Sequence, residues 1–231
     1  GGKHQNQEAY IMCSIFGSFD KDVIKKLLKL NQFRGNFSYS ITQGDKVVKD
    51  FGPFDTNRLD EFNDEDYIIC HVQAPTGGMI KDRDRIHPTE DVNSKLWHNG
   101  LLKPKGIKYL QEDLDETITF DTKLLHKHLL KSNFTRLSAI EGLFSCVFQY
   151  ANEIFLFRTK HGKLYINEDL SISSVRFSGI SKLHRPLEKS KNINYDTVYK
   201  LDLNSRTLNN ALTKVGKFET KKYNYIINGE L

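Results

Sequence analysis

The sequence lacks long apolar segments. No apolar run in its 231 residues approaches the length of a membrane span, and its first residues lack the apolar core of a secretory signal. A cytoplasmic location is therefore expected. Hydrophobic residues make up 38% of the chain and charged residues 27%, which indicates a soluble globular protein with one large core. The sequence contains no internal repeat and no low-complexity block.

Cysteine is also scarce. Cys13, Cys70 and Cys146 are an odd number of widely spaced cysteines, which predicts no disulfide framework. Cys70 and Cys146 lie in strand-like apolar runs and are expected to be inert core residues. Neither a Cys-x-x-Cys nor a His-Glu-x-x-His element occurs, and His126 and His128 are two positions apart on an expected helix, so they do not face each other. We therefore expect no metal site and no cofactor, and no glycine-rich loop for ATP is found.

The net charge of +5 comes from lysines scattered along the chain. A nucleic-acid surface would use basic residues next to aromatic ones, which can bind a single strand. The candidates are Lys103, Lys105, Lys108 and Tyr109, together with Lys221-Lys222-Tyr223 in the tail. Such clusters are more often solvated surface, so a nucleic-acid partner is the weaker alternative. A steep loss of binding with salt would support it.

Hydrophobic periodicity predicts helices and strands in alternation. Residues 21–30 read as a helix capped by Ser18 or Asp20, and residues 121–132 as a helix capped by Asp121. Residues 79–94 lack periodicity, and long irregular connections are commonly binding loops. After residue 208 only a weak helical pattern is present. Strands are predicted over residues 10–16, 66–72, 94–102, 144–150, 154–159, 164–166, 172–176 and 198–203, with a hairpin that turns at residues 43–45.

Cys13 directly follows Met12 and lies at the start of an apolar segment that is expected to be a strand. If Met12 and the residues before it are removed, Cys13 becomes the first residue. Its free α-amino group, with a pKa of roughly 7.7–8.0, can then accept the proton of a thiol whose pKa lies near roughly 8.5. An amide nitrogen cannot do this. The alternative is that Cys13 is a small buried apolar residue, as most free cysteines are.

Short motifs follow one another in a fixed order along most of the chain. They are residues 12–17 (MCSIFG), Arg34-Gly35 with Ser38, residues 71–78, His87-Pro88, His98-Asn99-Gly100, Phe120-Asp121-Thr122, residues 141–144 (EGLF) and residues 195–203. Taken in this order, they resemble the motifs of the class II glutamine amidotransferases, which are glutaminase domains of the N-terminal-nucleophile hydrolases.

The resemblance implies an α+β fold, a four-layer α-β-β-α sandwich of two largely antiparallel sheets. It covers residues 12–203, so we expect a glutaminase-like domain over residues 13–205. Residues 1–12 would then be a tag or leader before the nucleophile, and residues 206–231 a C-terminal extension.

The resemblance also implies roles for individual residues. Cys13 would attack the side-chain amide of glutamine, the Asn99 side chain and the Gly100 N–H would form the oxyanion hole, and Asp121 would bind the substrate α-ammonium group. Taken singly, Asn99-Gly100 is more commonly a tight turn, and Asp121 can serve as a helix cap. The other residues implied to bind substrate are Arg34, Gln73, Thr76, Gly77 and His87.

Some positions depart from the family pattern. Gln73 stands where the family has an arginine that pairs with the substrate α-carboxylate, and a neutral amide cannot replace that bidentate, charge-assisted pair. Arg83 or Arg85 in the long connection is a candidate for the missing charge. The departures concern the recognition of free glutamine and leave the nucleophile and the oxyanion residues in place. Further departures are Ser14, Phe37, Ala74 and Gly77.

The sequence therefore predicts a standalone class II glutamine amidotransferase that hydrolyses glutamine and supplies ammonia to a separate synthase. The residues after Leu203 are too few for a synthase domain, and the lysine-rich tail is a candidate docking element. The alternative is an altered or inactive member of the same fold, which serves as a binding subunit or hydrolyses another amide.

Overall fold

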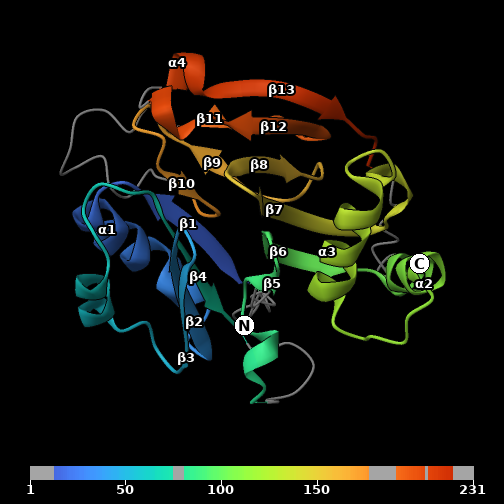
Figure 1. Ribbon diagram of the computed structural model, residues 1–231, viewed down its shortest axis with the longest axis horizontal. Helices are drawn as coiled ribbons and strands as arrows, with labels where there is room; N and C mark the ends of the chain where they lie inside the picture. Colours follow the sequence, from blue (N-terminus) through green and yellow to red (C-terminus); the bar gives the residue numbers. More distant parts are fainter. Residues whose placement is uncertain (1–12, 75–80, 177–190, 206–207, 221–231) are drawn as a thin grey trace, which may run out of the picture.

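Two sheets stacked face to face form the centre of the protein (Figure 1). The computed structural model describes residues 13–74, 81–176, 191–205 and 208–220. Sheet A has seven strands in the order β11-β9-β10-β1-β4-β2-β3, and sheet B has six in the order β13-β12-β8-β7-β6-β5. The strand pairs recorded in the described residues are antiparallel. Helices cover the outer face of each sheet, which gives four layers in the order α, β, β, α.

Sheet A is organised around β1 (Ser14–Ser18), which lies between β4 (Ile68–Gln73) and β10. Ser14 pairs with Val72, so Cys13 stands directly before the paired part of β1. The hairpin of β2 (Ser38–Gln43) and β3 (Lys46–Phe51) forms one edge. The remaining strands are β9 (Tyr165–Ile166), β10 (Ile172–Ser173) and β11 (Lys191–Asn192).

Sheet B is organised around the long strands β6 (Ser94–Leu102) and β7 (Gly142–Tyr150). These two strands pair along their whole length, and Asn99 lies opposite Ser145. Asn99 and Gly100 are therefore inside a central strand, not in the tight turn that is the commoner use of this dipeptide. The remaining strands are β5 (Thr89–Asp91), β8 (Glu153–Arg158), β12 (Thr197–Leu201) and β13 (Leu212–Lys217).

The helix α1 (Lys21–Asn31) covers the outer face of sheet A. Asp20 is its N-cap, and the carboxylate accepts hydrogen bonds from two backbone N–H groups of the first turn. Apolar residues at helical spacing give α1 one buried face, which packs on Phe16 and Ile68 of the sheet. The apolar residues of this face are Ile24, Leu27 and Leu28.

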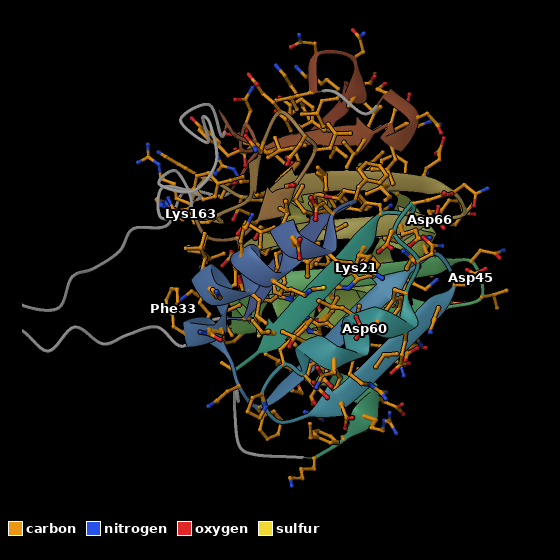
Figure 2. All side chains as sticks on the ribbon, turned by 90° about the vertical axis from the view of Figure 1, so that its left-hand side faces the viewer. Lys21, Phe33, Asp45, Asp60, Asp66 and Lys163 are labelled. Carbon is orange, nitrogen blue, oxygen red and sulfur yellow. The ribbon has the colours of Figure 1, made fainter. Side chains whose placement is uncertain are left out.

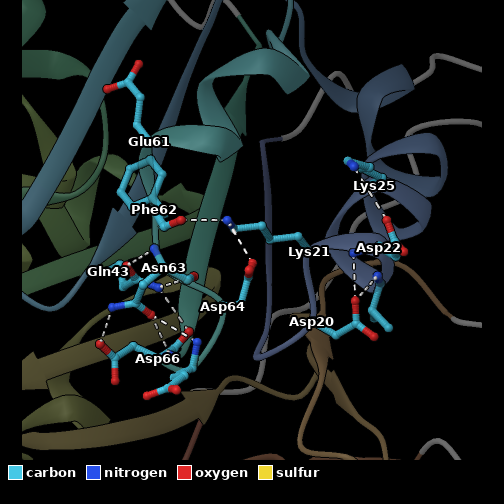
Figure 3. A network of polar contacts seen from close by, with 12 residues as sticks. Asp20, Lys21, Asp22, Lys25, Gln43, Glu61, Phe62, Asn63, Asp64 and Asp66 are labelled. Atoms are coloured by element: carbon cyan, nitrogen blue, oxygen red, sulfur yellow. Dashed lines mark hydrogen bonds and ion pairs between the residues drawn. The ribbon is translucent and has the colours of Figure 1, made fainter.

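Lys21 joins α1 to the segment that follows the 3-10 helix η2 (Thr56–Glu61). Its Nζ donates to the Phe62 carbonyl at 2.5 Å and lies 2.8 Å from a carboxylate oxygen of Asp64 (Figure 3). Figure 2 looks onto this outer layer, where Lys21 and Asp60 lie. Because the Asp64 side chain is exposed, the ion pair adds little stability, and the bond to the carbonyl does most of the positioning.

The helices α2 (Pro104–Leu114) and α3 (Asp121–Ser132) cover the outer face of sheet B. Proline in the first turn suits the start of α2, and Asp115 ends it in the left-handed conformation at φ 54°. None of the helices in the described ranges is long and apolar enough to cross a membrane. The short helices are α4 (Leu208–Ala211) and the 3-10 turns η1 (Gln32–Arg34), η3 (Arg83–Arg85), η4 (Leu137–Ala139) and η7 (Leu203–Ser205).

A third apolar layer lies between the two sheets. Ile15 of sheet A and Trp97 and Val147 of sheet B are completely buried there. Side chains that interdigitate at this density leave little freedom for one sheet to move against the other. The packing therefore fixes β1 relative to β6. Cys13 stands at the start of β1, and Asn99 lies within β6.

The fold class predicted from the sequence is confirmed, as are α1, α3 and the hairpin of β2 and β3. The helix α2 was not predicted, although Ile107, Leu110 and Leu114 recur at helical spacing. The weak helical pattern after residue 208 is a single turn followed by β13, which pairs with β12. Pairing with a neighbouring strand overrides the weak local preference there. The division into a domain over residues 13–205 and an extension over residues 206–231 stays a prediction.

Replacement of Phe218 tests whether the segment around β13 supports the fold. Phe218 is buried and its ring lies 6.5 Å from that of Phe144. We expect Phe218→Ala to lower the free energy of unfolding by about 3 kcal/mol, because a buried aromatic ring is removed. The matched control is Val215→Ala within the adjacent strand β13, where the side chain is exposed and its removal should change stability by less than about 0.5 kcal/mol. Equal urea midpoints for the two variants would show that Phe218 adds nothing to the core.

Candidate active site

Cys13 lies buried at the head of β1, with 8% of its surface exposed. The backbone N–H of Ala74 forms a hydrogen bond to its sulfur, and the charges of Arg34 and Asp121 act on the thiol. Burial raises the pKa of the Cys13 thiol to about 11, and the negative charge of Asp121 adds to this rise, while Ala74 and Arg34 oppose it. With its nitrogen in a peptide bond to Met12, Cys13 is therefore protonated at neutral pH and is a poor nucleophile.

The hydroxyl of Ser14, the residue after Cys13, fixes the position of β1. The Ser14 hydroxyl donates to the Asn31 side chain at the end of α1, and Asn31 also donates to the Leu27 carbonyl at 2.6 Å and to the Ser173 hydroxyl at 3.1 Å. All these groups are buried. Ser14, which departs from the family's glycine, thus anchors β1 to the helix that covers it.

Arg34 and Gly35 follow α1 and approach the strand end that carries Gln73. The Arg34 guanidinium donates to the Ser174 carbonyl at 3.3 Å, and its charge lowers the pKa of Cys13. A Cβ on Gly35 would lie 2.3 Å from the Gln73 carbonyl carbon, so only glycine allows this approach. The Arg-Gly pair therefore brings a cation close to Cys13.

The Gln73 side chain is bound on both sides. Its Oε1 accepts from the Ser38 hydroxyl at 2.9 Å, and its Nε2 donates to the Arg85 carbonyl at 3.2 Å. Gln73 therefore attaches the η3 turn to β4. In the same turn, the Arg85 guanidinium lies 5.9 Å from the centre of the Phe120 ring, directly before Asp121, whereas Arg83 donates to the Lys49 carbonyl at 2.6 Å.

Asn99 is almost completely buried and is incompletely bonded. Its Nδ2 makes one long hydrogen bond of 3.4 Å to the Ser145 hydroxyl, and its Oδ1 has no hydrogen-bond partner among the described residues. Gly100 has φ +149°, and a Cβ there would lie 2.0 Å from the Leu143 carbonyl oxygen. Any larger residue would push β6 away from β7. The Asn99 amide thus keeps donor capacity for a group that enters the site.

Asp121 is the first residue of α3, and its carboxylate is held by backbone donors. Oδ1 accepts from the Thr122 N–H at 2.8 Å and Oδ2 from the Leu102 N–H at 3.4 Å. The sequence predicted Asp121 as the cap, but the N-cap is Phe120, which makes no side-chain capping bond. A carboxylate in the first turn is still favoured by the helix dipole. Its charge also acts on the Cys13 thiol and raises the pKa of that thiol.

Three buried histidines and Thr122 form a continuous chain of hydrogen bonds behind these residues. His71 Nε2 lies 2.9 Å from His87 Nδ1 and 3.3 Å from the His98 carbonyl oxygen. Thr122 Oγ1 lies 3.0 Å from His87 Nε2 and 3.0 Å from His98 Nδ1. Burial lowers the pKa of His71 to about 3 and also lowers the pKa of His87 and of His98, while Asp121 acts on His98 in the opposite direction. These rings are neutral at physiological pH.

Solved structures of other proteins share this arrangement of sheets. The glutamine phosphoribosylpyrophosphate amidotransferase from B. subtilis superimposes with a TM-score of 0.60 at 15% identity over 89% of this chain. The structure of the allosteric regulatory enzyme of purine biosynthesis superimposes with a TM-score of 0.61, at 14% identity over 89% of this chain. The glutamine aminotransferase class-II domain protein from Silicibacter pomeroyi superimposes with a TM-score of 0.51 at 9% identity. That match covers 89% of this chain and 99% of the Silicibacter pomeroyi chain. The chain has the fold of a class II glutamine amidotransferase domain.

The likeness to these class II domains is one of fold, because the identities are low. The chain spans about half the length of the first two proteins, since the match covers 48% of each. No protein-family model and no curated protein matches the chain.

Against this fold, the residues predicted from the sequence divide into three groups. Those whose charges or hydrogen bonds meet at or beside Cys13 are Arg34 and Asp121, and Asn99 and Gly100 lie on the facing sheet. His87 is buried, with both ring nitrogens bonded inside the protein, and Gln73 is bonded on both sides of its amide. Thr76 and Gly77 lie outside the described residues. The catalytic and binding roles of the whole set stay predictions.

The sequence did not reveal the buried histidine chain. His71 and His98 were part of recognised motifs, but nothing in their spacing showed that they meet, because they lie on different sheets. In the described ranges, no three side chains of histidine, cysteine, aspartate and glutamate are placed to hold a metal ion.

The lowered pKa of His71 predicts a pH-dependent stability. Unfolded histidine binds a proton below about pH 6.5, whereas folded His71 stays neutral down to about pH 3. The unfolded state thus binds more protons in this window, and the free energy of unfolding must fall as the pH falls, by up to about 1.4 kcal/mol per pH unit for each such histidine.

Urea unfolding between pH 6 and pH 4 measures this slope. We expect His71→Asn to be less stable than the unmodified chain at pH 7 but to lose less stability on acidification, because one buried titrating group is gone. Equal slopes for the two chains would mean that His71 is not held neutral in the folded protein.

Proposed function

We propose that this protein hydrolyses the side-chain amide of glutamine through Cys13, once Cys13 is the first residue of the chain. The observation that carries the proposal is the position of Cys13 at the head of β1, where Arg34 and Asp121 act on one buried thiol within a class II glutamine amidotransferase fold. The thiol is on sheet A, and the candidate oxyanion donors are on sheet B.

The main chemical obstacle is that the Cys13 thiol is protonated, and a free α-amino group on Cys13 would remove it. A thiol whose pKa is about 11 is almost fully protonated at neutral pH. A free α-amino group has a pKa of roughly 7.7–8.0 and is attached to the same residue, so it can accept the thiol proton as the sulfur attacks. We therefore propose that residues 1–12 precede the working domain as a tag or leader and block the base while they are attached.

The reaction would proceed in two balanced steps. In the first, the thiol proton passes to the α-amine, the sulfur bonds to the amide carbon, the carbon–nitrogen bond breaks and the amine returns the proton to the departing ammonia. In the second, the α-amine takes a proton from water as the water oxygen bonds to the thioester carbon, the carbon–sulfur bond breaks, the sulfur takes that proton back and glutamate leaves. In both steps negative charge develops on the former carbonyl oxygen, where the Asn99 amide and the Gly100 N–H would donate hydrogen bonds.

Asp121 is proposed to bind the α-ammonium group of the substrate. Its carboxylate is oriented by the backbone N–H groups of Thr122 and Leu102 and remains partly accessible. A carboxylate held in this way needs little reorganisation to receive a cation. Since its charge raises the pKa of the Cys13 thiol, a bound ammonium group would also ease formation of the thiolate.

The ammonia would pass to a separate acceptor protein. The fold match over 99% of the class-II domain protein from Silicibacter pomeroyi supports a domain of this kind as a complete unit. The second candidate function is an altered member of the fold that binds a partner or hydrolyses another amide. It is favoured by the Gln73 amide, which is occupied by Ser38 and the Arg85 carbonyl and carries no charge for a substrate carboxylate.

Replacement of Asn99 tests the proposed reaction. In a chain whose first residue is Cys13, we expect Asn99→Ala to lower kcat for glutamate release by roughly 10² to 10³, as loss of an oxyanion donor does. The control Asn152→Ala removes an exposed amide from the turn between β7 and β8 and should leave kcat unchanged. A fall in kcat of less than about threefold for Asn99→Ala, with the fold retained, would contradict the proposed role of Asn99 as an oxyanion donor.

Arg85 is the proposed cation for the substrate α-carboxylate, because it packs over Phe120 next to Asp121. Arg83 is directed to the Lys49 carbonyl on β3 instead. We expect Arg85→Ala to raise KM for glutamine about tenfold or more, the scale of one charge-assisted hydrogen bond, with kcat little changed. The matched control is Arg83→Ala. An unchanged KM for Arg85→Ala would show that Arg85 does not bind the substrate α-carboxylate.

A further inference from the structure

The histidine chain connects three elements that carry proposed site residues. His71 is on β4 of sheet A, His98 on β6 of sheet B, and Thr122 on α3. Two of them are adjacent to proposed site residues, since His98 directly precedes Asn99 and Thr122 directly follows Asp121. The chain of hydrogen bonds therefore crosses from one sheet to the other beside the site.

The Thr122 hydroxyl is the shared member of this chain. It lies 3.0 Å from His87 Nε2 and 3.0 Å from His98 Nδ1, and it is almost completely buried. A hydroxyl has one proton and two acceptor lone pairs, and this one also lies 3.4 Å from Asp121 Oδ1, to which it can donate. Each neutral ring has one N–H and one acceptor nitrogen. Thr122 thus couples the proton positions of His87 and His98 to each other and links both rings to Asp121.

Two further contacts extend the chain to both sheets. His98 lies 3.9 Å from the Asp121 carboxylate through Nδ1, and its own carbonyl oxygen lies 3.3 Å from His71 Nε2. Loss of the hydroxyl would leave two buried ring nitrogens without partners, which is costly in a low-dielectric interior. The rings would shift to find others, and the residues attached to them would move.

We propose that Thr122 is a positioning residue that holds Asp121 and Asn99 at a fixed separation through His98, a role that rests on the proposed glutamine hydrolysis. Thr122 touches neither the substrate nor the thiol in this account. It determines where the ammonium-binding carboxylate and the oxyanion donor stand relative to each other. A shift of about 1 Å in such groups lowers turnover by as much as about 10²-fold.

Thr89 of β5 supplies a matched control, because its hydroxyl bonds to a histidine of the same helix, α3. His126 of α3 is also buried, and its two ring nitrogens lie 2.9 Å from the Thr89 hydroxyl and 2.8 Å from the Ser94 hydroxyl. No proposed site residue is adjacent to Thr89, Ser94 or His126. Thr89→Val therefore removes the same kind of buried hydroxyl–histidine bond without reaching Asp121 or Asn99.

The experiment compares Thr122→Val, Thr122→Ser and Thr89→Val in a chain whose first residue is Cys13. Both valine variants should unfold at lower urea than the parent. Only Thr122→Val should lower kcat/KM for glutamine, by about 10- to 100-fold, with both a higher KM and a lower kcat. Thr122→Ser, which keeps the hydroxyl, should recover kcat/KM to within about threefold of the parent. If Thr122→Val does not fold, Thr122→Ala takes its place.

A readout without turnover separates this proposal from the proposed function. In the NMR spectrum of the folded protein, Thr122→Val should shift the side-chain amide signals of Asn99, and Thr89→Val should not. Shifts confined to Thr122→Val support positioning even if the parent fails to release glutamate, a failure that would count against the proposed reaction alone. Equal kinetics and equal Asn99 signals in the two valine variants would overturn the positioning role.

Discussion

The proposed site depends on one constraint, the fixed stacking of two sheets that each carry half of it. Cys13 stands at the head of β1 in sheet A, and Asn99 lies within β6 of sheet B. The apolar layer between them, with Ile15 and Trp97 completely buried, sets the distance between the halves. The polar histidine chain beside the site adds direction to that packing, because hydrogen bonds fix orientation whereas apolar contacts mainly fix separation.

Burial has opposite consequences for the groups of this site. It keeps His71, His87 and His98 neutral, so that they can serve as oriented donors and acceptors. It also raises the pKa of the Cys13 thiol to about 11, which makes the internal cysteine inert at neutral pH. A base delivered within the same residue resolves this conflict, since the α-amine needs no access path through the packed surroundings. The same burial strengthens the hydrogen bonds that would stabilise an oxyanion.

The sequence predicted individual helices and strands because these are local in the chain, and the resemblance of its ordered motifs implied the four-layer arrangement. Alternation in residues 144–150 and helical spacing in residues 21–30 are set by neighbours a few positions away. The helix α2 was missed although its apolar residues have the same spacing, and β13 was missed because a partner strand decides its conformation. The bonds of Gln73 and the meeting of His71 with His98 join segments far apart in sequence, and no single-sequence pattern records them.

The most direct test of the central claim is covalent labelling with an electrophilic analogue of glutamine. Cys70 and Cys146 are completely buried and serve as internal controls within the same chain. In a chain whose first residue is Cys13, peptide mass analysis should find Cys13 modified, with excess glutamine protecting it and the other two cysteines unmodified. A chain that retains Met12 should react far more slowly. A folded chain in which Cys13 stays unmodified, or in which the two chains react equally, would contradict the account of Cys13 as an N-terminal nucleophile.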